Sequence, residues 1–460
     1  MKHYTWWQRL LGFGLSLVVL LLLASCAGSN SAKDGATPAP TSKTTAGSSD
    51  TVAPDAFVEE AGGKLPVRDI GDASISFEVD GKSTSYGDTP VIGTPIPDAP
   101  APEGEDDPAG EIGDPEPVAA DSGEAFVLTA AEWNDNENWP FFTNLVNAGT
   151  ISFPSFGIDP RNRIVLTLTD AAGNPLDNET AVLTDAAGNA LWTARTDKQG
   201  TAYLFFGQDQ TPDHVDAGGV STPVTVQTPD GSGQGTSVTA RVDTLAVTGT
   251  RSAAAQTGLQ VMFLVDTTGS MSDEIAYLQK DFSDIAAAVG SDGISYAACF
   301  YRDEGDDYVT RMNPFTADVA AVQGKINGEY ADGGGDMPEA VAEALTEAVS
   351  AAQGWSETDA KLLFLIYDAP PHEKTDAALD AAIRSAADQG IRVVPVVASN
   401  ADRETELFGR AAAIVTGGTY VFLTDDSGVG GEHLEPIVGS YEVELLHDVI
   451  VRIINENRPG

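Results

Sequence analysis

A chain of 460 residues can hold two or three domains, and not all of this one has the composition of a folded core. It carries 69 acidic and only 25 basic side chains, which gives a net charge of −44. A field of this sign repels nucleic-acid phosphates and anionic lipid headgroups, which argues against both as general partners. The same charge keeps the protein soluble and attracts cations.

Residues 1–25 have the features of a targeting segment that is not part of the fold. Basic residues flank the start of an apolar stretch, Leu10 to Leu23, which is short for a membrane-spanning helix of ~20 residues. The stretch ends in Leu23-Ala24-Ser25-Cys26, which is similar to a lipobox. The resemblance implies cleavage before Cys26, lipid on that cysteine, and a place in the bacterial cell envelope, anchored to a membrane and facing away from the cytoplasm. An ordinary secretory signal with a chance cysteine is the alternative.

Residues 26–122 lack the apolar side chains needed for a core. Ser, Thr, Ala, Pro and Gly dominate up to about residue 55, and prolines and acids dominate from Thr89 to Asp121. This composition predicts a disordered, acidic and proline-rich tether. A short hairpin, with strands at 74–79 and 82–86, is predicted within it.

Residues 123–250 are predicted to form a small β-sandwich. The motif Leu-Thr-Asp-Ala-Ala-Gly-Asn occurs at 168–174 and again at 183–189, so two short strands should end in similar turns. The pattern is similar to carboxypeptidase regulatory-like and Cna B-type sandwiches, and the resemblance implies an Ig-like stalk without chemistry. Ahead of these strands, 132–139 is rich in oxygen atoms but lacks the glycine and terminal acid of an EF-hand. A capped turn whose tryptophans pack on the next domain is therefore favoured over a Ca²⁺ loop.

Residues 255–460 alternate strand and helix, which predicts a doubly wound α/β domain with a mainly parallel sheet. Apolar runs predict strands at 261–265, 294–301, 308–313, 362–367, 391–398 and 419–423. Helices are expected at 273–289, 317–327, 338–352, 376–389, 402–415 and 441–456. The joint at 303–307 is too short for a crossover helix, so its two flanking strands should form an antiparallel hairpin.

Three hard oxygens follow the first of these strands at alternate positions, on Asp266, Thr268 and Ser270. A second apolar run, 362–367, ends at Asp368. If the two strands are parallel neighbours, their aspartates emerge at one edge of the sheet. Oxygen ligands of this kind suit a divalent cation, Mg²⁺, Mn²⁺ or Ca²⁺.

This stretch resembles the metal-ion-dependent adhesion site of von Willebrand factor type A domains, with Thr268 as the middle hydroxyl. The resemblance covers 255–460 and implies a metal set of Asp266, Thr268, Ser270, Asp336 and Asp368. The family usually has Thr where this chain has Asp336. A third carboxylate should tighten cation binding and disfavour an acidic ligand from a partner. Alternatively, Asp336 caps the next helix, with Pro338 in its first turn and Glu339 completing a capping box.

The favoured function is a membrane-anchored lipoprotein that binds a protein ligand through its divalent metal, in adhesion or another envelope interaction. The alternative is a scaffold subunit of an envelope complex in which the metal only orders loops. A ligand protein, still unidentified, and a membrane are thus the expected partners, and nucleic acid is not.

Catalysis has little support in the sequence, so the chain is not interpreted as an enzyme. Of five histidines, only His372 lies near the predicted site, and it fits an exposed loop better than a general base. No Gly-x-Ser-x-Gly elbow, HExxH pair or Walker-type phosphate loop occurs. Cys299 is expected to be a buried packing residue. The acidic turn 303–307 is expected to be a solvated hairpin rather than a second cation site.

Overall fold

The computed structural model describes residues 67–68, 127–152, 160–224, 242–335, 337–428 and 431–459. Cys26, nearly all of the predicted tether with its hairpin, and Asp336 lie outside the described residues. All described residues belong to one compact unit, 63–460. Within the described ranges, no helix has both the length and the apolar character to cross a membrane.

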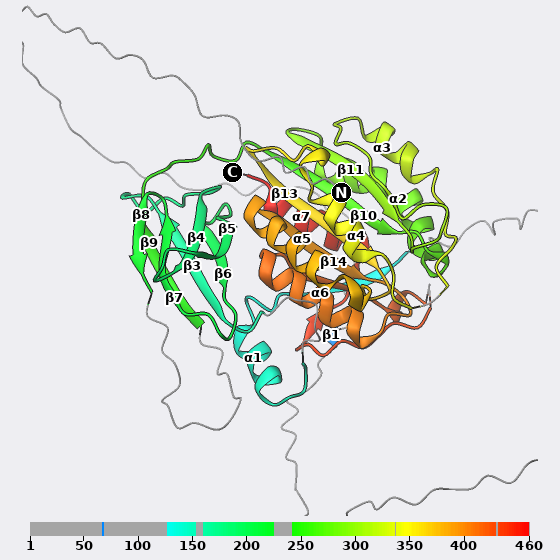
Figure 1. Ribbon diagram of the computed structural model, residues 1–460. Coiled ribbons are helices and arrows are strands. Elements are labelled where there is room, and N and C mark those ends of the chain that lie inside the picture. Colours follow the sequence, from blue (N-terminus) through cyan, green and yellow to red (C-terminus); the bar gives the residue numbers. More distant parts are fainter. Residues whose placement is uncertain are drawn as a thin grey trace, which may run out of the picture. The chain divides into compact units, whose positions relative to one another are not determined.

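An eight-stranded mixed sheet forms the centre of the C-terminal part, in the order β12-β11-β10-β13-β14-β15-β2-β17 (Figure 1). Its parallel strands are β10 (Gly258–Asp266), β11 (Ile294–Tyr301), β13 (Asp359–Tyr367), β14 (Ile391–Val397) and β15 (Tyr420–Thr424). The predicted α/β fold is thereby confirmed. The hairpin is confirmed as well, since β12 (Thr310–Arg311) pairs antiparallel with β11.

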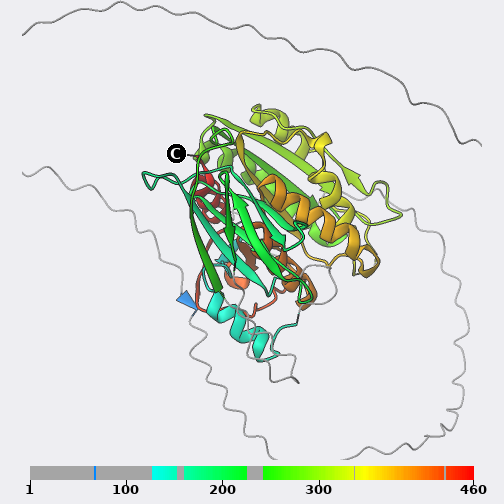
Figure 2. The same ribbon diagram turned by 60° about the vertical axis from the view of Figure 1, so that its left-hand side comes forward.

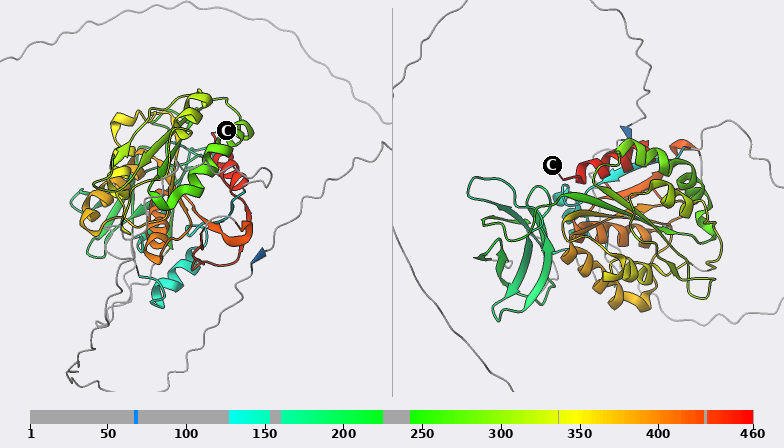
Figure 3. Two further views of the ribbon diagram at one scale, coloured as in Figure 1. Left: turned by 90° about the vertical axis from the view of Figure 1, so that its right-hand side faces the viewer. Right: turned by 90° about the horizontal axis from the view of Figure 1, so that it is seen from above.

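Helices cover both faces of this sheet (Figure 3). They are α2 (Ser272–Val289), α3 (Val319–Ile326), α4 (Val341–Ala348), α5 (Asp376–Gln389), α6 (Arg403–Thr416) and α7 (Leu446–Asn457). Side chains of β10 alternate between two cores: Val261 and Phe263 pack with α2, α3 and α7, whereas Met262 and Leu264 pack with α4, α5 and α6. A strand buried on both faces needs an unbroken apolar run, which is why this segment is so apolar.

Short 3₁₀ turns complete the connections, as η1 (Gly269–Met271), η2 (Ala351–Gln353), η3 (Glu373–Thr375) and η4 (Asp425–Ser427). The glycines after α5 and α6, Gly390 and Gly417, have φ values of 69° and 71°. This left-handed conformation ends both helices and is accessible to glycine without strain.

The last helix starts later than the sequence predicts, at Leu446 instead of residue 441. Residues 441–445 form two short strands, β16 (Tyr441–Glu442) and β17 (Glu444–Leu445). Tyr441 and Val443 are buried while Glu442 is exposed, so the run follows the two-residue period of a strand. β16 pairs with β1 (Val67–Arg68), and β17 pairs with β2.

A strand from far upstream completes the sheet. β2 (Thr129–Trp133) pairs antiparallel with β15, although the sequence placed this segment in the predicted sandwich. An ion pair holds the same segment to α6, since Arg410 donates from Nε and Nη2 to the two Asp135 carboxylate oxygens at 2.8 Å each. Both flanking tryptophans, Trp133 and Trp139, are buried as expected. The second begins α1 (Trp139–Asn147).

Two small sheets are formed by strands within 163–223 and 242–248 (Figure 2). One is β6-β3-β9, from β6 (Thr201–Phe205), β3 (Arg163–Thr169) and β9 (Val242–Thr248). The other is β5-β4-β7-β8, from β5 (Ala190–Arg195), β4 (Thr180–Asp185), β7 (Pro212–Ala217) and β8 (Val220–Pro223). The repeated turns share one geometry: Asp170 and Asp185 each accept backbone N–H bonds from residues two and four positions later.

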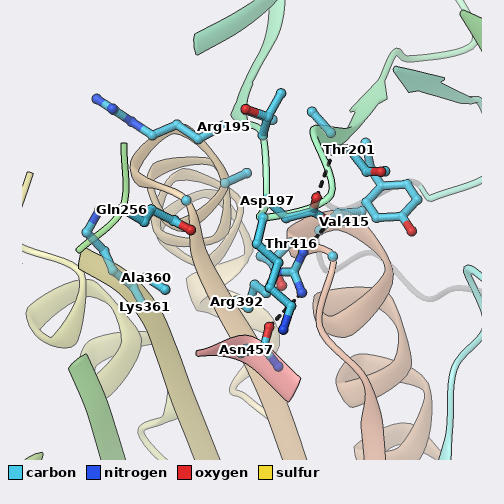
Figure 4. Close-up of a pocket in the computed structure, with 18 residues that line it drawn as sticks. Arg195, Asp197, Thr201, Gln256, Ala360, Lys361, Arg392, Val415, Thr416 and Asn457 are labelled. Carbon is cyan, nitrogen blue, oxygen red and sulfur yellow. Dashed lines mark hydrogen bonds and ion pairs between the residues drawn. The ribbon is translucent and has the colours of Figure 1, made fainter. Parts of the chain in front are cut away.

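Polar side chains connect these sheets to the α/β part. Arg392 lies between Asp197, at 2.6 Å, and Asn457, at 2.7 Å (Figure 4). They border a small cavity of about 40 Å³ that is also lined by Lys361. Burial and then the nearby Arg195 lower the pKa of Lys361 to about 8.

Candidate metal site

Two aspartates emerge at one edge of the sheet, where β10 and β13 end. Val265 pairs with Ile366 in the parallel register of these strands, so Asp266 and Asp368 follow at adjacent strand ends. A glycine loop meets them from the connection between α3 and α4. There the Asp332 N–H donates to Thr267 O at 3.1 Å, and the Gly269 N–H donates to Gly333 O at 3.3 Å. The predicted convergence of separate loops is therefore present among the described residues.

Asp266 is fully buried and only half satisfied by hydrogen bonds. Its Oδ1 accepts from the backbone N–H of Thr268 at 2.9 Å and from the Thr268 hydroxyl at 2.8 Å. Its Oδ2 has no hydrogen-bond partner within 3.5 Å among the described residues, and the Tyr301 side chain is near enough to lower the pKa of Asp266. Burial, with Asp368 as a second cause, raises the pKa of Asp266 to about 7. A buried carboxylate oxygen without a partner is costly unless a cation or a proton neutralises it.

Asp368 and the two hydroxyls complete the inner group. Thr268 Oγ1 lies 3.5 Å from Ser270 Oγ. Burial raises the pKa of Asp368 to about 6, against a hydrogen bond from the Ser270 side chain that lowers it. Glu274 also raises this pKa, because a like charge disfavours ionisation. The structure thus brings four of the five predicted ligands together, and Asp336 is the one it does not describe.

The glycine loop permits a close approach that no other residue would allow. Gly334 has a φ of 74°, and a Cβ there would lie 2.9 Å from Glu339 Oε1 and 3.2 Å from Thr268 Cβ. Its backbone N–H donates to Asp306 Oδ2 at 2.9 Å. Helix α4 begins only at Val341, and its N-cap position is Ala340. Glu339 therefore precedes the helix instead of lying in its first turn, and Asp336, the other member of the predicted capping box, lies outside the described residues.

Glu339 is the site residue that sequence reasoning missed. It is only 4% exposed, and its Oε2 has no partner among the described residues. Burial first, and then the charges of Asp266 and Asp303, raise the pKa of Glu339 to about 9. In the sequence it follows Pro338 and precedes an apolar run, which resembles a helix start and gives no sign that its carboxyl group is buried.

A cavity of about 340 Å³ opens between these loops. Its lining includes Thr268, Ser270, Gly334, Met337, Glu339, Asp368 and Asn400. In the described part of the chain, no three His, Cys, Asp or Glu side chains are grouped closely enough to hold a metal ion by themselves. A cation here would consequently need the hydroxyl oxygens as ligands, and hydroxyl oxygens suit Mg²⁺ and Ca²⁺.

The loops around the cavity are joined by charged pairs. His372 Nε2 lies 2.7 Å from Asp303 Oδ1, and Lys374 donates to Glu304 at 2.6 Å. Both pairs connect the turn after β11 to the loop after β13. Asp303 is buried, so the acidic turn is not the fully solvated hairpin that the sequence predicted, and His372 is largely covered rather than exposed.

A serine, a histidine and an aspartate also line up close to the site. Ser399 Oγ lies 3.2 Å from His433 Nε2, and His433 Nδ1 lies 2.7 Å from Asp425 Oδ1. This order matches that of a hydrolytic triad. The Ser399 hydroxyl, however, donates to Glu274 at 2.8 Å and the residue is 3% exposed. The Ser399 hydroxyl is therefore buried and engaged with Glu274, so it is not accessible as a nucleophile.

Residues 260–429 match the family model of the von Willebrand factor A domain. No curated protein matches the chain. Among solved structures, it is similar to a von Willebrand factor type A protein from Catenulispora acidiphila, with 19% sequence identity and a TM-score of 0.32. That match covers 44% of this chain and 43% of the other, less than half of either. By the family match, residues 260–429 form a von Willebrand factor A domain, a module that generally mediates protein interactions.

Proposed function

We propose that the von Willebrand factor A domain binds a divalent cation, Mg²⁺ or alternatively Mn²⁺ or Ca²⁺, and through it a protein ligand. The observation that carries this proposal is the buried Asp266 carboxylate, whose Oδ2 has no partner among the described residues. It stands at the same sheet edge as Asp368 and two hydroxyls. Removing a carboxylate from water without a partner costs several kcal/mol. Two carboxyl groups at this edge, Asp266 and Glu339, are buried with an unpartnered oxygen, and a bound cation would offset that cost.

Asp266, Thr268, Ser270 and Asp368 would hold the ion, and we include Asp336 from the sequence pattern. The ion would supply positive charge that a ligand oxygen of the partner can bind. Thr268 orients Asp266 through two hydrogen bonds to Oδ1, which leaves Oδ2 free. Ser270 is exposed, so its hydroxyl stands where the partner would approach.

We further propose that lipid on Cys26 anchors the protein in the cell envelope and that residues 26–122 are a tether. Support comes from the sequence alone, through the lipobox-like Leu23-Ala24-Ser25-Cys26. Release of a Cys26→Ala variant from the membrane fraction is the expected result. A variant that stays in that fraction would contradict anchoring through this residue.

Isothermal titration calorimetry of the full mature chain with Mn²⁺ tests the metal site. We expect one cation to bind wild-type protein, binding to be lost in Asp266→Asn, and binding to be retained in Asp292→Asn, an exposed aspartate outside the site. Equal binding in all three proteins would refute the site. Capture of a protein ligand that EDTA abolishes would then favour adhesion, and EDTA-insensitive capture would favour the scaffold alternative.

A further inference from the structure

The surface beside the metal cavity exposes apolar side chains. Among the described residues, only four large hydrophobic side chains are clearly exposed: Val220, Tyr330, Met337 and Leu445. Tyr330 is the most exposed, at 59%, and Met337 follows at 44%. Both belong to the connection between α3 and α4, and Met337 lines the cavity itself. Single exposed hydrophobics are ordinary, but two of them in one loop at a candidate binding site favour an interface.

Tyr330 is exposed although its backbone and ring are held by contacts with Arg302. Its carbonyl accepts from Arg302 Nη2 at 2.9 Å, and the guanidinium of that arginine lies 5.1 Å from the ring centroid. Arg302 is itself buried. Two residues later, the Asp332 N–H donates to Thr267 O, which fixes the loop against the turn after β10. A rigid aromatic side chain loses little entropy when a partner covers it.

The charge around these residues is strongly negative. Exposed carboxylates on the neighbouring loops are Glu304, Asp307, Asp332 and Glu373. Two exposed bases lie nearby and both are paired, Lys374 with Glu304 and Arg311 with Glu329. A second copy of this chain, with its net charge of −44, would be repelled.

We propose that Tyr330 and Met337 form the contact surface for a basic protein segment that packs an aromatic or aliphatic side chain against them. This rests on the proposed function, because Met337 lines the candidate metal cavity and the contact surface would engage the same partner. Contact with the two apolar side chains would provide affinity. The exposed carboxylates on the neighbouring loops would speed association and select positively charged partners.

Selection from a display library of random dodecapeptides on the full mature chain, with Mg²⁺ present, tests the inference. Enriched peptides should carry net positive charge and at least one aromatic or aliphatic residue. Affinity of such a peptide should fall about tenfold in a Tyr330→Ser, Met337→Ser double variant, and it should fall as salt concentration rises. A Leu445→Ser variant, altered at a distant exposed hydrophobic, should bind as wild type does.

Three results would overturn the inference: enrichment of acidic peptides, no enrichment at all, or equal affinity in the double variant and wild type. Mn²⁺ calorimetry on the same protein separates this failure from failure of the metal site. Cation binding combined with acidic peptides would leave the proposed function standing and remove only the inference. Basic peptides that bind a protein unable to bind Mn²⁺ would support the surface and refute the metal site.

Discussion

Replacing Asp266 with asparagine isolates the cost of burying its charge. The pKa of this carboxyl is raised from 3.8 to about 7, chiefly by burial. The folded protein then keeps the proton up to about pH 7, whereas the unfolded chain releases it near 3.8. Stability from this group is therefore present at low pH and is lost as pH rises through the folded pKa. Each pKa unit is worth ~1.4 kcal/mol, so the loss amounts to about 4 kcal/mol.

Urea denaturation between pH 4 and 8 in EDTA measures this loss. The Asp266→Asn variant has no proton to release at this position, so wild type minus variant removes the contribution of carboxylates that do not interact with Asp266, whereas Asp368 and Glu339 do interact with it. We expect that difference in the free energy of unfolding to fall by about 4 kcal/mol across the range. Saturating Mg²⁺ should abolish the fall, because the cation binds the ionised carboxylate. A difference that stays level with pH in EDTA would refute the burial argument.

Three further predictions concern neighbouring groups. Glu339→Gln should raise the free energy of unfolding in EDTA at pH 7, since a buried carboxyl is removed. The same variant should bind Mn²⁺ about tenfold more weakly, and unchanged Mn²⁺ calorimetry would show that Glu339 does not interact with the cation. Arg410→Met leaves Asp135 buried without its cation, while Glu406 keeps its ion pair with Arg403, so urea denaturation should show a loss of ~3–5 kcal/mol, and a loss below ~1 kcal/mol would contradict that account. Gly334→Ala should cost ~1–3 kcal/mol because its φ is 74° and should also weaken Mn²⁺ binding, whereas Gly324→Ala inside α3 should leave Mn²⁺ binding unchanged.

The sequence predicted the central strands well, because a strand buried on both faces must be apolar throughout and can be recognised locally. It missed β2, since Thr-Ala-Ala-Glu-Trp has no strong strand pattern and pairs with residues almost 300 positions away. It also began the last helix at Tyr441 instead of Leu446, because the apolar residues in 441–445 fit both the helical and the strand period. The burial of Glu339 depends on the glycine loop folding over it, which no local pattern records. Asp336 remains a prediction from the sequence alone.

The N-terminal boundary of the α/β domain depends on β2, which pairs with β15. The sequence suggested residues 255–460, but a chain cut there would lose β2 and leave β15 as an open edge strand, a surface prone to pair with other chains. It would also remove Asp135 and leave the fully buried Arg410 with Glu406 as its remaining acidic partner. Breaking a buried pair in this way costs ~3–5 kcal/mol, a large part of the stability of an ordinary domain. The cation and peptide experiments therefore require a chain that includes residues 127–152, and a fragment 255–460 as stable as the full chain would disprove this reasoning.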